Sequence, residues 1–149
     1  TTIFDYWSVD TMCRADEGNL TDDEKKLADI YSKLMNFART DKTVTGLSYD
    51  LMYANPHSAS FNPDRQYAFL RRSGRQLLVV VVNFDNLDRD ILLNIPEHAF
   101  EYLKLSDGKD VEGEEILTGE SFAACLSSKQ PLSIHVPKYG AAIIKINKA

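Results

Sequence analysis

The fold of this chain is decided by residues 66–84, which read QYAFLRRSGRQLLVVVVNF. Two segments rich in apolar residues, 66–72 and 76–84, lie on either side of the pair Ser73-Gly74, which is typical of a tight turn. The segment therefore predicts two consecutive β-strands. Residues 79–82 are continuously apolar, a pattern typical of a strand that is covered on both faces. We expect this second strand to lie in the centre of a sheet.

Further short strands are predicted on both sides of this segment. Residues 47–53 alternate between apolar and polar side chains, as expected of a half-buried strand. Other strands are predicted at residues 90–95, 101–106, 131–136 and 141–146, with a short one at residues 115–118. Seven or eight short strands with no helices between them favour an antiparallel sandwich or barrel.

One amphipathic helix is predicted ahead of the strands, in residues 20–40. Thr21 and Glu24 have the spacing of a capping box, in which each side chain binds the other residue's backbone N–H. An apolar stripe with helical spacing follows at Leu27, Ile30, Tyr31 and Leu34, and continues at Phe37 or Ala38. Residues 1–19 show no sustained period, so we interpret them as a connecting segment.

Composition excludes several classes of protein. The chain has 149 residues, 44% of them hydrophobic, which is enough for one compact domain. A net charge of −5 offers little to neutralise phosphates, so we expect no nucleic-acid binding. The longest apolar run, residues 77–82, is far shorter than the ~20 residues of a membrane span. Two distant cysteines, Cys13 and Cys125, provide neither a disulfide framework nor a zinc ligand set.

Motifs that carry chemistry are not found in the sequence. It has no G-x-S-x-G, H-E-x-x-H, G-x-G-x-x-G or P-loop pattern, so we predict no metal and no cofactor. His57, His98 and His135 lie in separate predicted elements. Residues 97–120 hold eight acidic residues and two lysines, which is consistent with a soluble connection or with a cation site, and we favour the soluble connection.

The order of these elements resembles the C-terminal region of α-amylase family glycoside hydrolases. Residues 67–74 (YAFLRRSG) and 77–84 (LLVVVVNF) look like two consecutive hairpin strands of that family, which read y-x-f-x-R-x-x-g and l-l-V-v-x-N-F. Residues 46–51, 115–120 and 132–144 are similar to other strands of the family, and residues 2–8 look like the approach to its last barrel helix. The resemblance extends over nearly the whole chain.

This resemblance implies a division of the chain into three parts. Residues 1–19 would connect from a missing catalytic (β/α)8 barrel, residues 20–40 would be the last barrel helix, and residues 41–149 would form the all-β C-terminal domain. The implied fold is mainly β, an antiparallel Greek-key β-sandwich of about seven to eight strands preceded by one amphipathic α-helix. The first residues carry no initiator Met and no leader pattern, so we expect a piece of a longer protein.

The resemblance also implies a function. Retaining glycosidases need two carboxylates about 5 to 5.5 Å apart, and in this family they lie on the barrel strands. The G-x-R-x-D and H-D motifs of the family are absent here, so we predict no catalytic residue in this chain. The expected role is a non-catalytic accessory domain that stabilises the barrel of an enzyme acting on starch or maltodextrins. Its expected barrel-facing residues are Trp7, Leu27, Ile30, Tyr31 and Leu34, and without the barrel we expect self-association.

Two alternatives remain. The chain could be a carbohydrate-binding module that contacts α-glucan through exposed aromatic residues, for which Phe61, Tyr102 and Tyr139 are the candidates. We expect such binding to be weak or absent, because the sequence indicates no convergent group of aromatic and polar residues. If the resemblance is accidental, the chain would be a stand-alone interaction domain.

Overall fold

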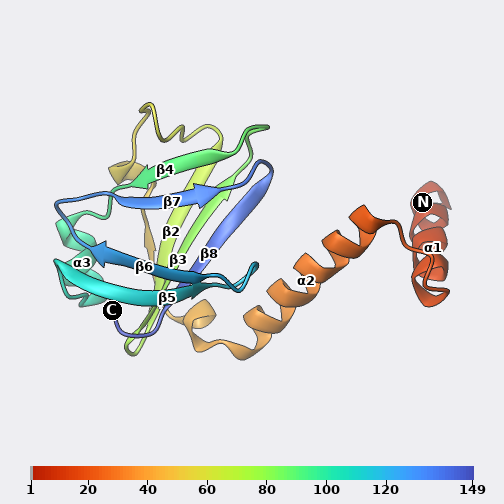
Figure 1. Ribbon diagram of the computed structural model, residues 1–149, viewed down its shortest axis with the longest axis horizontal. Coiled ribbons are helices and arrows are strands. Elements are labelled where there is room, and N and C mark those ends of the chain that lie inside the picture. Colours follow the sequence, from red (N-terminus) through yellow and green to blue (C-terminus); the bar gives the residue numbers. More distant parts are fainter. Residues whose placement is uncertain (1) are drawn as a thin grey trace. The chain divides into compact units, whose positions relative to one another are not determined.

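The computed structural model describes the backbone of residues 2–149 and the side chains of residues 9–149. The chain divides into two compact units, Thr1–Asn36 and Phe37–Ala149. The first contains helix α1 (Thr2–Asp16) and most of helix α2 (Asp22–Thr40), and the second contains the end of α2 and every strand, as Figure 1 shows.

The first unit is a pair of helices, where we predicted one. Helix α1 occupies most of the expected connecting segment. Its apolar residues are spread around the helix instead of forming a stripe, so the spacing of residues 2–16 gives no helical signal. The capping box of α2 forms as predicted: the Thr21 N–H donates to Glu24 Oε2 at 2.8 Å, and the Glu24 N–H donates to Thr21 Oγ1 at 3.3 Å. Arg14 of α1 donates to both oxygens of Glu24, and with the Thr21 hydrogen bonds it lowers the pKa of Glu24 to about 2.

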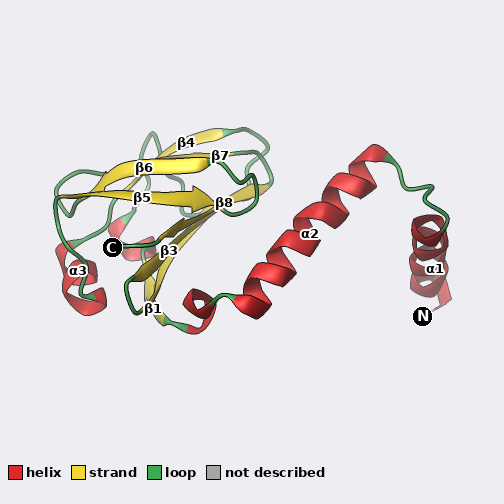
Figure 2. Ribbon diagram, turned by 60° about the horizontal axis from the view of Figure 1, so that its bottom comes forward, coloured by secondary structure: helices red, strands yellow, loops and turns green. Residues whose placement is uncertain are grey.

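The second unit is a β-sandwich, which confirms the predicted fold class. Its larger sheet has six strands in the order β1-β2-β3-β8-β5-β6, its smaller sheet pairs β4 with β7, and all pairs are antiparallel (Figure 2). The strands are β1 (Leu47–Asp50), β2 (Gln66–Ser73), β3 (Gln76–Asn83), β4 (Arg89–Leu93), β5 (Lys109–Glu115), β6 (Ser121–Leu126), β7 (Leu132–Val136) and β8 (Gly140–Ile146).

The topology places β3 in the middle of the large sheet, as predicted. The hairpin of β2 and β3 joins around Ser73 and Gly74, and β8 pairs with β3 on its other side. After the β5–β6 hairpin, β7 lies in the small sheet and β8 returns to pair with β5, which is a Greek-key connection.

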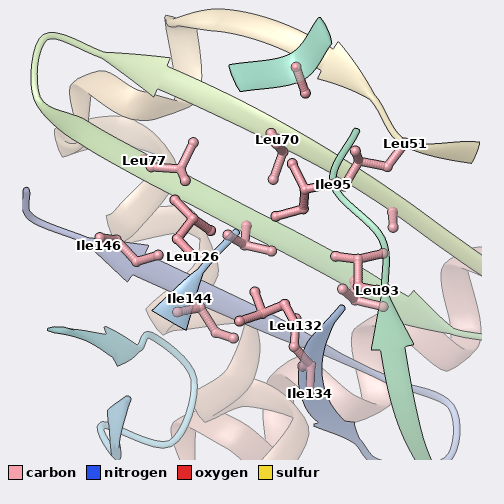
Figure 3. Close-up of a cluster of buried hydrophobic side chains, with 14 of the residues drawn as sticks. Leu51, Leu70, Leu77, Leu93, Ile95, Leu126, Leu132, Ile134, Ile144 and Ile146 are labelled. Carbon is pink, nitrogen blue, oxygen red and sulfur yellow. The ribbon is translucent and has the colours of Figure 1, made fainter. Parts of the chain in front are cut away.

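The hydrophobic core lies between the two sheets. Figure 3 shows that side chains from both sheets point toward one another there, among them Leu70 and Leu77 of the large sheet and Leu93 and Ile134 of the small one. Helix α3 (Glu97–Leu103) contributes three further core residues, namely Ala99, Phe100 and Leu103. Alternate residues of each strand face this core, so each sheet also has an outward face.

Three predicted strands differ from the observed elements. Residues 101–106 are not a strand, because Ala99, Phe100 and Leu103 share the buried face of a short helix that ends at Lys104 in a left-handed conformation. The short strand expected at residues 115–118 is wrong too: most of that segment is the turn between β5 and β6. Strand β1 ends at Asp50, whose carboxylate accepts a hydrogen bond from the Met52 N–H, and a short 3-10 helix, η2 (Met52–Ala54), follows.

Two adjacent leucines of β4 provide a test of this core. Leu93 is fully buried and Leu92 is 45% exposed on the outward face. We expect Leu93→Ala to lower the free energy of unfolding by about 2–5 kcal/mol, because it leaves a cavity between the sheets. The same change at Leu92 should cost less than about 0.5 kcal/mol. Urea unfolding of both variants measures the difference, and equal losses would contradict this arrangement of the sandwich.

Candidate functional site

The outward face of the large sheet carries an apolar surface. The strand register aligns Tyr67, Val82 and Ala141 in one row across β2, β3 and β8, and Phe69, Val80 and Ile143 in the next. We call these six residues the outer sheet face. Their neighbours along each strand belong to the core between the sheets, so the six side chains point away from that core.

Within the second unit, one end of the outer sheet face is covered, and Val80 and Ile143 there are each 7% exposed. A short 3-10 helix, η1 (Lys42–Thr45), packs there: Arg71 Nη1 donates to the Val44 carbonyl at 2.7 Å, and Lys145 forms an ion pair with Asp41. Burial opposes ionisation of Asp41, but hydrogen bonds from Lys145 and Thr43 outweigh it and lower the pKa of Asp41. At the other end Tyr67 is 41% exposed.

A buried polar network lies where β3 ends. Asn83 is fully buried, and its Oδ1 accepts hydrogen bonds from Gln66 Nε2 and from the Asp85 N–H, both at 3.0 Å. Its Nδ2 donates to the carbonyls of Leu87 and Pro137 at 2.9 and 3.1 Å. Asn83 thus uses its full hydrogen-bonding capacity to tie β2, β3 and the loops before β4 and β8 together.

Asp85 extends this network with charge. Its side chain is 3% exposed and accepts hydrogen bonds from Arg65 Nη1 at 3.0 Å and from Arg89 at 3.0 and 2.5 Å. The Arg89 hydrogen bonds, opposed by burial and supported by the Asn86 N–H and Arg65, lower the pKa of Asp85. A carboxylate fixed in this way is suited to holding loops together and unsuited to donating a proton.

Four aromatic side chains meet beside β1, and we call them the aromatic platform. Tyr49 comes from β1, Tyr53 from η2, and His98 and Tyr102 from α3. The Tyr49 hydroxyl lies 2.5 Å from the Tyr53 hydroxyl and 2.9 Å from His98 Nδ1. The Tyr49 ring centroid lies 5.8 Å from those of both His98 and Tyr102. Burial, together with the Tyr53 hydroxyl, raises the pKa of Tyr49.

In the aromatic platform, one buried ring supports three exposed rings. Tyr49 is only 9% exposed, whereas Tyr53 is 67% and Tyr102 48% exposed, and His98 is exposed as well. The rings of His98 and Tyr102 lie at 18° to each other, with centroids 6.4 Å apart. Two tyrosine rings and an imidazole are therefore exposed to solvent, and buried Tyr49 holds them in place.

The three predicted sugar-contacting residues do not come together. Tyr102 belongs to the aromatic platform, and Tyr139 is 74% exposed in the turn between β7 and β8. Phe61 is 2% exposed and part of the core, so our prediction that it is an exposed stacking residue is wrong. The sequence reasoning missed Tyr53 and His98, although the spacing of His98 and Tyr102 would have placed them on one face of a helix.

The predicted barrel-facing residues lie on the two helices of the first unit. Leu27, Ile30 and Tyr31 of α2 are 54%, 43% and 59% exposed, and Leu34 is half-buried. None of the residues of α2 is buried. The side chain of Trp7 lies outside the described residues.

Other classes of site are not seen in the part of the chain that the structure describes. Among those residues, no three His, Cys, Asp or Glu side chains gather in a group that could hold a metal ion. The helices there are too short or too polar to cross a membrane. The acidic segment 97–120 is divided among α3, β5 and the turn after β5.

The fold and its surfaces define an all-β sandwich domain that follows a helix. Residues 57–147, more than half of the chain, match the model of the family described as "Alpha amylase, C-terminal all-beta domain". The chain therefore belongs to the α-amylase C-terminal all-β domain family, as the motifs of its hairpin strands suggested. No curated protein matches the sequence.

Solved structures support the same fold. An α-amylase from Anoxybacillus aligns with a TM-score of 0.56 and 17% identity over 84% of this chain and 23% of its own. AmyP, solved in complex with maltose, aligns with a TM-score of 0.58 and 15% identity over 85% and 22%. The maltogenic α-amylase AmyB from Thermotoga neapolitana aligns with a TM-score of 0.55 and 14% identity over 78% and 24%. This chain thus spans less than a quarter of each of these proteins.

The Asp85 network predicts a specific dependence of stability on pH. Because its pKa is lower in the folded chain than the ordinary value of about 3.9, ionised Asp85 stabilises the fold above that pH, and the contribution is lost as the pH falls through the folded pKa. We expect Asp85→Asn to lower the free energy of unfolding at about pH 7, and its difference from wild type to narrow below about pH 4.

Urea unfolding at several pH values measures this effect. Asp64→Asn is the control, since the Asp64 side chain is 78% exposed and should change stability by less than about 0.5 kcal/mol. A difference between Asp85→Asn and wild type that grows as the pH falls would show that the sign of the Asp85 contribution is wrong.

Proposed function

We propose that this chain is a non-catalytic accessory domain that docks on the catalytic barrel of an α-amylase-type glycoside hydrolase and stabilises it. The observation that carries the proposal is the outer sheet face, which is apolar across three strands: Val80 and Ile143 are buried, Phe69, Val82 and Ala141 are partly exposed, and Tyr67 is 41% exposed. Family membership supports a glycoside hydrolase as the protein that supplies the missing cover.

The contrast between the two sheets supports a docking role for the large one. Outward positions of the small sheet are mostly polar: Asp90 of β4 and Ser133 and His135 of β7, with His135 Nδ1 2.7 Å from Asp90 Oδ1. An antiparallel sheet that faces water normally has such a surface. The outer sheet face instead has aromatic and aliphatic side chains, whose burial against a partner is favourable by about 25 cal/mol per Å2 of apolar area.

Helix α2 of the first unit has a separate apolar surface that we also assign to contact with the barrel. Its exposed apolar side chains Leu27, Ile30 and Tyr31, with half-buried Leu34, form the stripe that we assign to the barrel, together with Trp7. Apolar side chains at helical spacing are normally buried against another element. In a chain without the barrel, this stripe is the surface through which we expect self-association.

The substrate class that we assign to the whole enzyme is starch or maltodextrins. Two of the aligned structures are described as α-amylases, and a third was solved in complex with maltose. These descriptions concern those proteins, and they support α-glucans as the substrates to test first with the enzyme that contains this domain.

We expect no glycosidase activity from the 149-residue chain. Retaining cleavage needs a carboxylate nucleophile and a carboxylic acid about 5 to 5.5 Å apart in a cleft, and we assign both to the barrel. Incubation of the purified chain with soluble starch or maltoheptaose should release no reducing ends above the rate in buffer. Turnover that disappears when an Asp or Glu of this chain is changed to Asn or Gln would contradict the assignment.

A pair of substitutions tests docking through the outer sheet face. The double variant Tyr67→Thr with Val82→Thr makes the open end polar while retaining residues that favour strands. In a longer chain that includes the barrel, we expect the double variant to lower Tm by several degrees, about 1–3 kcal/mol of lost apolar burial. In the 149-residue chain, where this end already faces water, the Tm should change much less.

Leu92→Thr is the matched control, because Leu92 has a similar exposed fraction, 45%, on the outward face of the other sheet. It should leave the Tm of both chain lengths nearly unchanged. Equal losses of Tm in the long and short chains for the double variant would mean that the outer sheet face serves only the domain's own folding. If the double variant leaves the Tm of the long chain unchanged, the outer sheet face is not the interface with the barrel.

A further inference from the structure

The rings of the aromatic platform are held by one another through hydrogen bonds and ring contacts. Tyr49 belongs to the core cluster and is hydrogen-bonded through its hydroxyl to both Tyr53 and His98. Its ring also contacts the ring of Tyr102, at a centroid distance of 5.8 Å and an angle of 46°. One buried tyrosine therefore positions three exposed rings that come from η2 and α3. Because these rings are already held in place, less side-chain entropy is lost when a ligand binds.

We propose that the aromatic platform is a carbohydrate-binding site that takes the pyranose rings of an α-1,4-glucan. Tyr53 and Tyr102 offer exposed aromatic faces on which the C–H face of a sugar ring can stack. Their hydroxyls and the imidazole of His98 surround these faces with groups that donate and accept hydrogen bonds. A sugar ring has the same combination of an apolar face and a polar edge.

The chemistry of the surroundings disfavours other ligands. Two acids, Glu97 and Glu101, directly precede His98 and Tyr102 in α3, and both are exposed. Their negative charges oppose a phosphate or carboxylate ligand. The exposed hydroxyls and imidazole are poor partners for a purely apolar groove ligand. A neutral polyhydroxylated ligand satisfies both conditions, and the choice of an α-glucan among such ligands rests on the proposed function.

The aromatic platform and the outer sheet face lie on opposite sides of the large sheet at β1 and β2. Tyr49 pairs with Leu70, which faces the core, whereas Phe69 of the outer sheet face pairs with Asp50. A barrel docked on the outer sheet face would therefore leave the aromatic platform open to solvent. The two proposals depend on different residues, so a failure of docking and a failure of sugar binding can be told apart by experiment.

The test is a titration of the 149-residue chain with maltoheptaose, followed by amide chemical shifts in NMR spectra. We expect saturable shifts centred on residues 53, 98 and 102, with a Kd of about 0.1–5 mM, as befits an open site with two stacking rings. Tyr53→Ala and Tyr102→Ala should each weaken binding by about fivefold or more. Both side chains are largely exposed, so the variants should remain folded, and their melting temperatures check this.

Two further variants separate contact from positioning. Tyr139→Asn removes an exposed tyrosine elsewhere and should leave the affinity unchanged; asparagine tolerates the positive φ of 48° at that position. Tyr49→Phe keeps the buried ring but removes the hydroxyl that holds Tyr53 and His98. It should weaken binding by about two- to fivefold while the shifts remain centred on the same residues, because the orientation of the rings is loosened and not lost.

Several outcomes would overturn the proposal. They are the absence of saturable shifts up to about 20 mM maltoheptaose, shifts centred on Tyr139, or unchanged affinity in both alanine variants. Cellohexaose is the control for linkage, and binding of cellohexaose without maltoheptaose would overturn the α-glucan assignment. Binding of an arginine-rich peptide in place of maltoheptaose would instead make the aromatic platform a cation-binding surface.

Discussion

Strand β3 must be covered on both faces, and most of this structure can be understood from that requirement. Its residues 77–81 are all buried, so neither face can be left to water. The small sheet and α3 cover one face and form the core. On the other face, the segment held by Asp41 and Arg71 covers one end, and the rings of Tyr67 and Phe69 extend beyond it. A domain built around such a strand has an apolar outer surface, and the proposed docking on the barrel rests on that surface.

The polar contacts of the sandwich serve the same architecture. Asn83 and Asp85 lie at the end of β3, where three loops meet, and buried polar atoms there would be costly without partners. The motif that ends the β3 strand in Asn-Phe thus has a structural reason: the amide of Asn83 closes the sandwich at that end. The hydrogen-bonding groups of Asn83 and Asp85 already have partners within the domain. The surfaces that we propose for binding therefore lie elsewhere, on the outer sheet face and the aromatic platform.

The two proposed surfaces would give one small domain two separate roles. The outer sheet face would hold the domain on the barrel, while the aromatic platform, on the opposite side of the sheet at β1, would stay accessible to a polymeric substrate. A glucan chain bound there would be retained near the enzyme between catalytic events, which raises its effective concentration at the active site. Stabilisation of the barrel would then depend on one side of the large sheet, and retention of substrate on the other.

Some features of this chain follow from its local sequence, and others depend on its tertiary structure. The sequence alone determined the β2–β3 hairpin, the central place of β3 and the capping box of Thr21 and Glu24, because these depend on neighbouring residues and on simple periodicity. It predicted a strand where α3 ends and did not predict the β5–β6 hairpin, because β5 has a single apolar residue, Val111, and the conformation of such short segments depends on the core that they pack against. Only the tertiary structure decided that Phe61 is buried and that Tyr49 meets His98, 49 residues away. A long-range contact of this kind depends on how the strands and the helix pack, so no local sequence pattern predicts it.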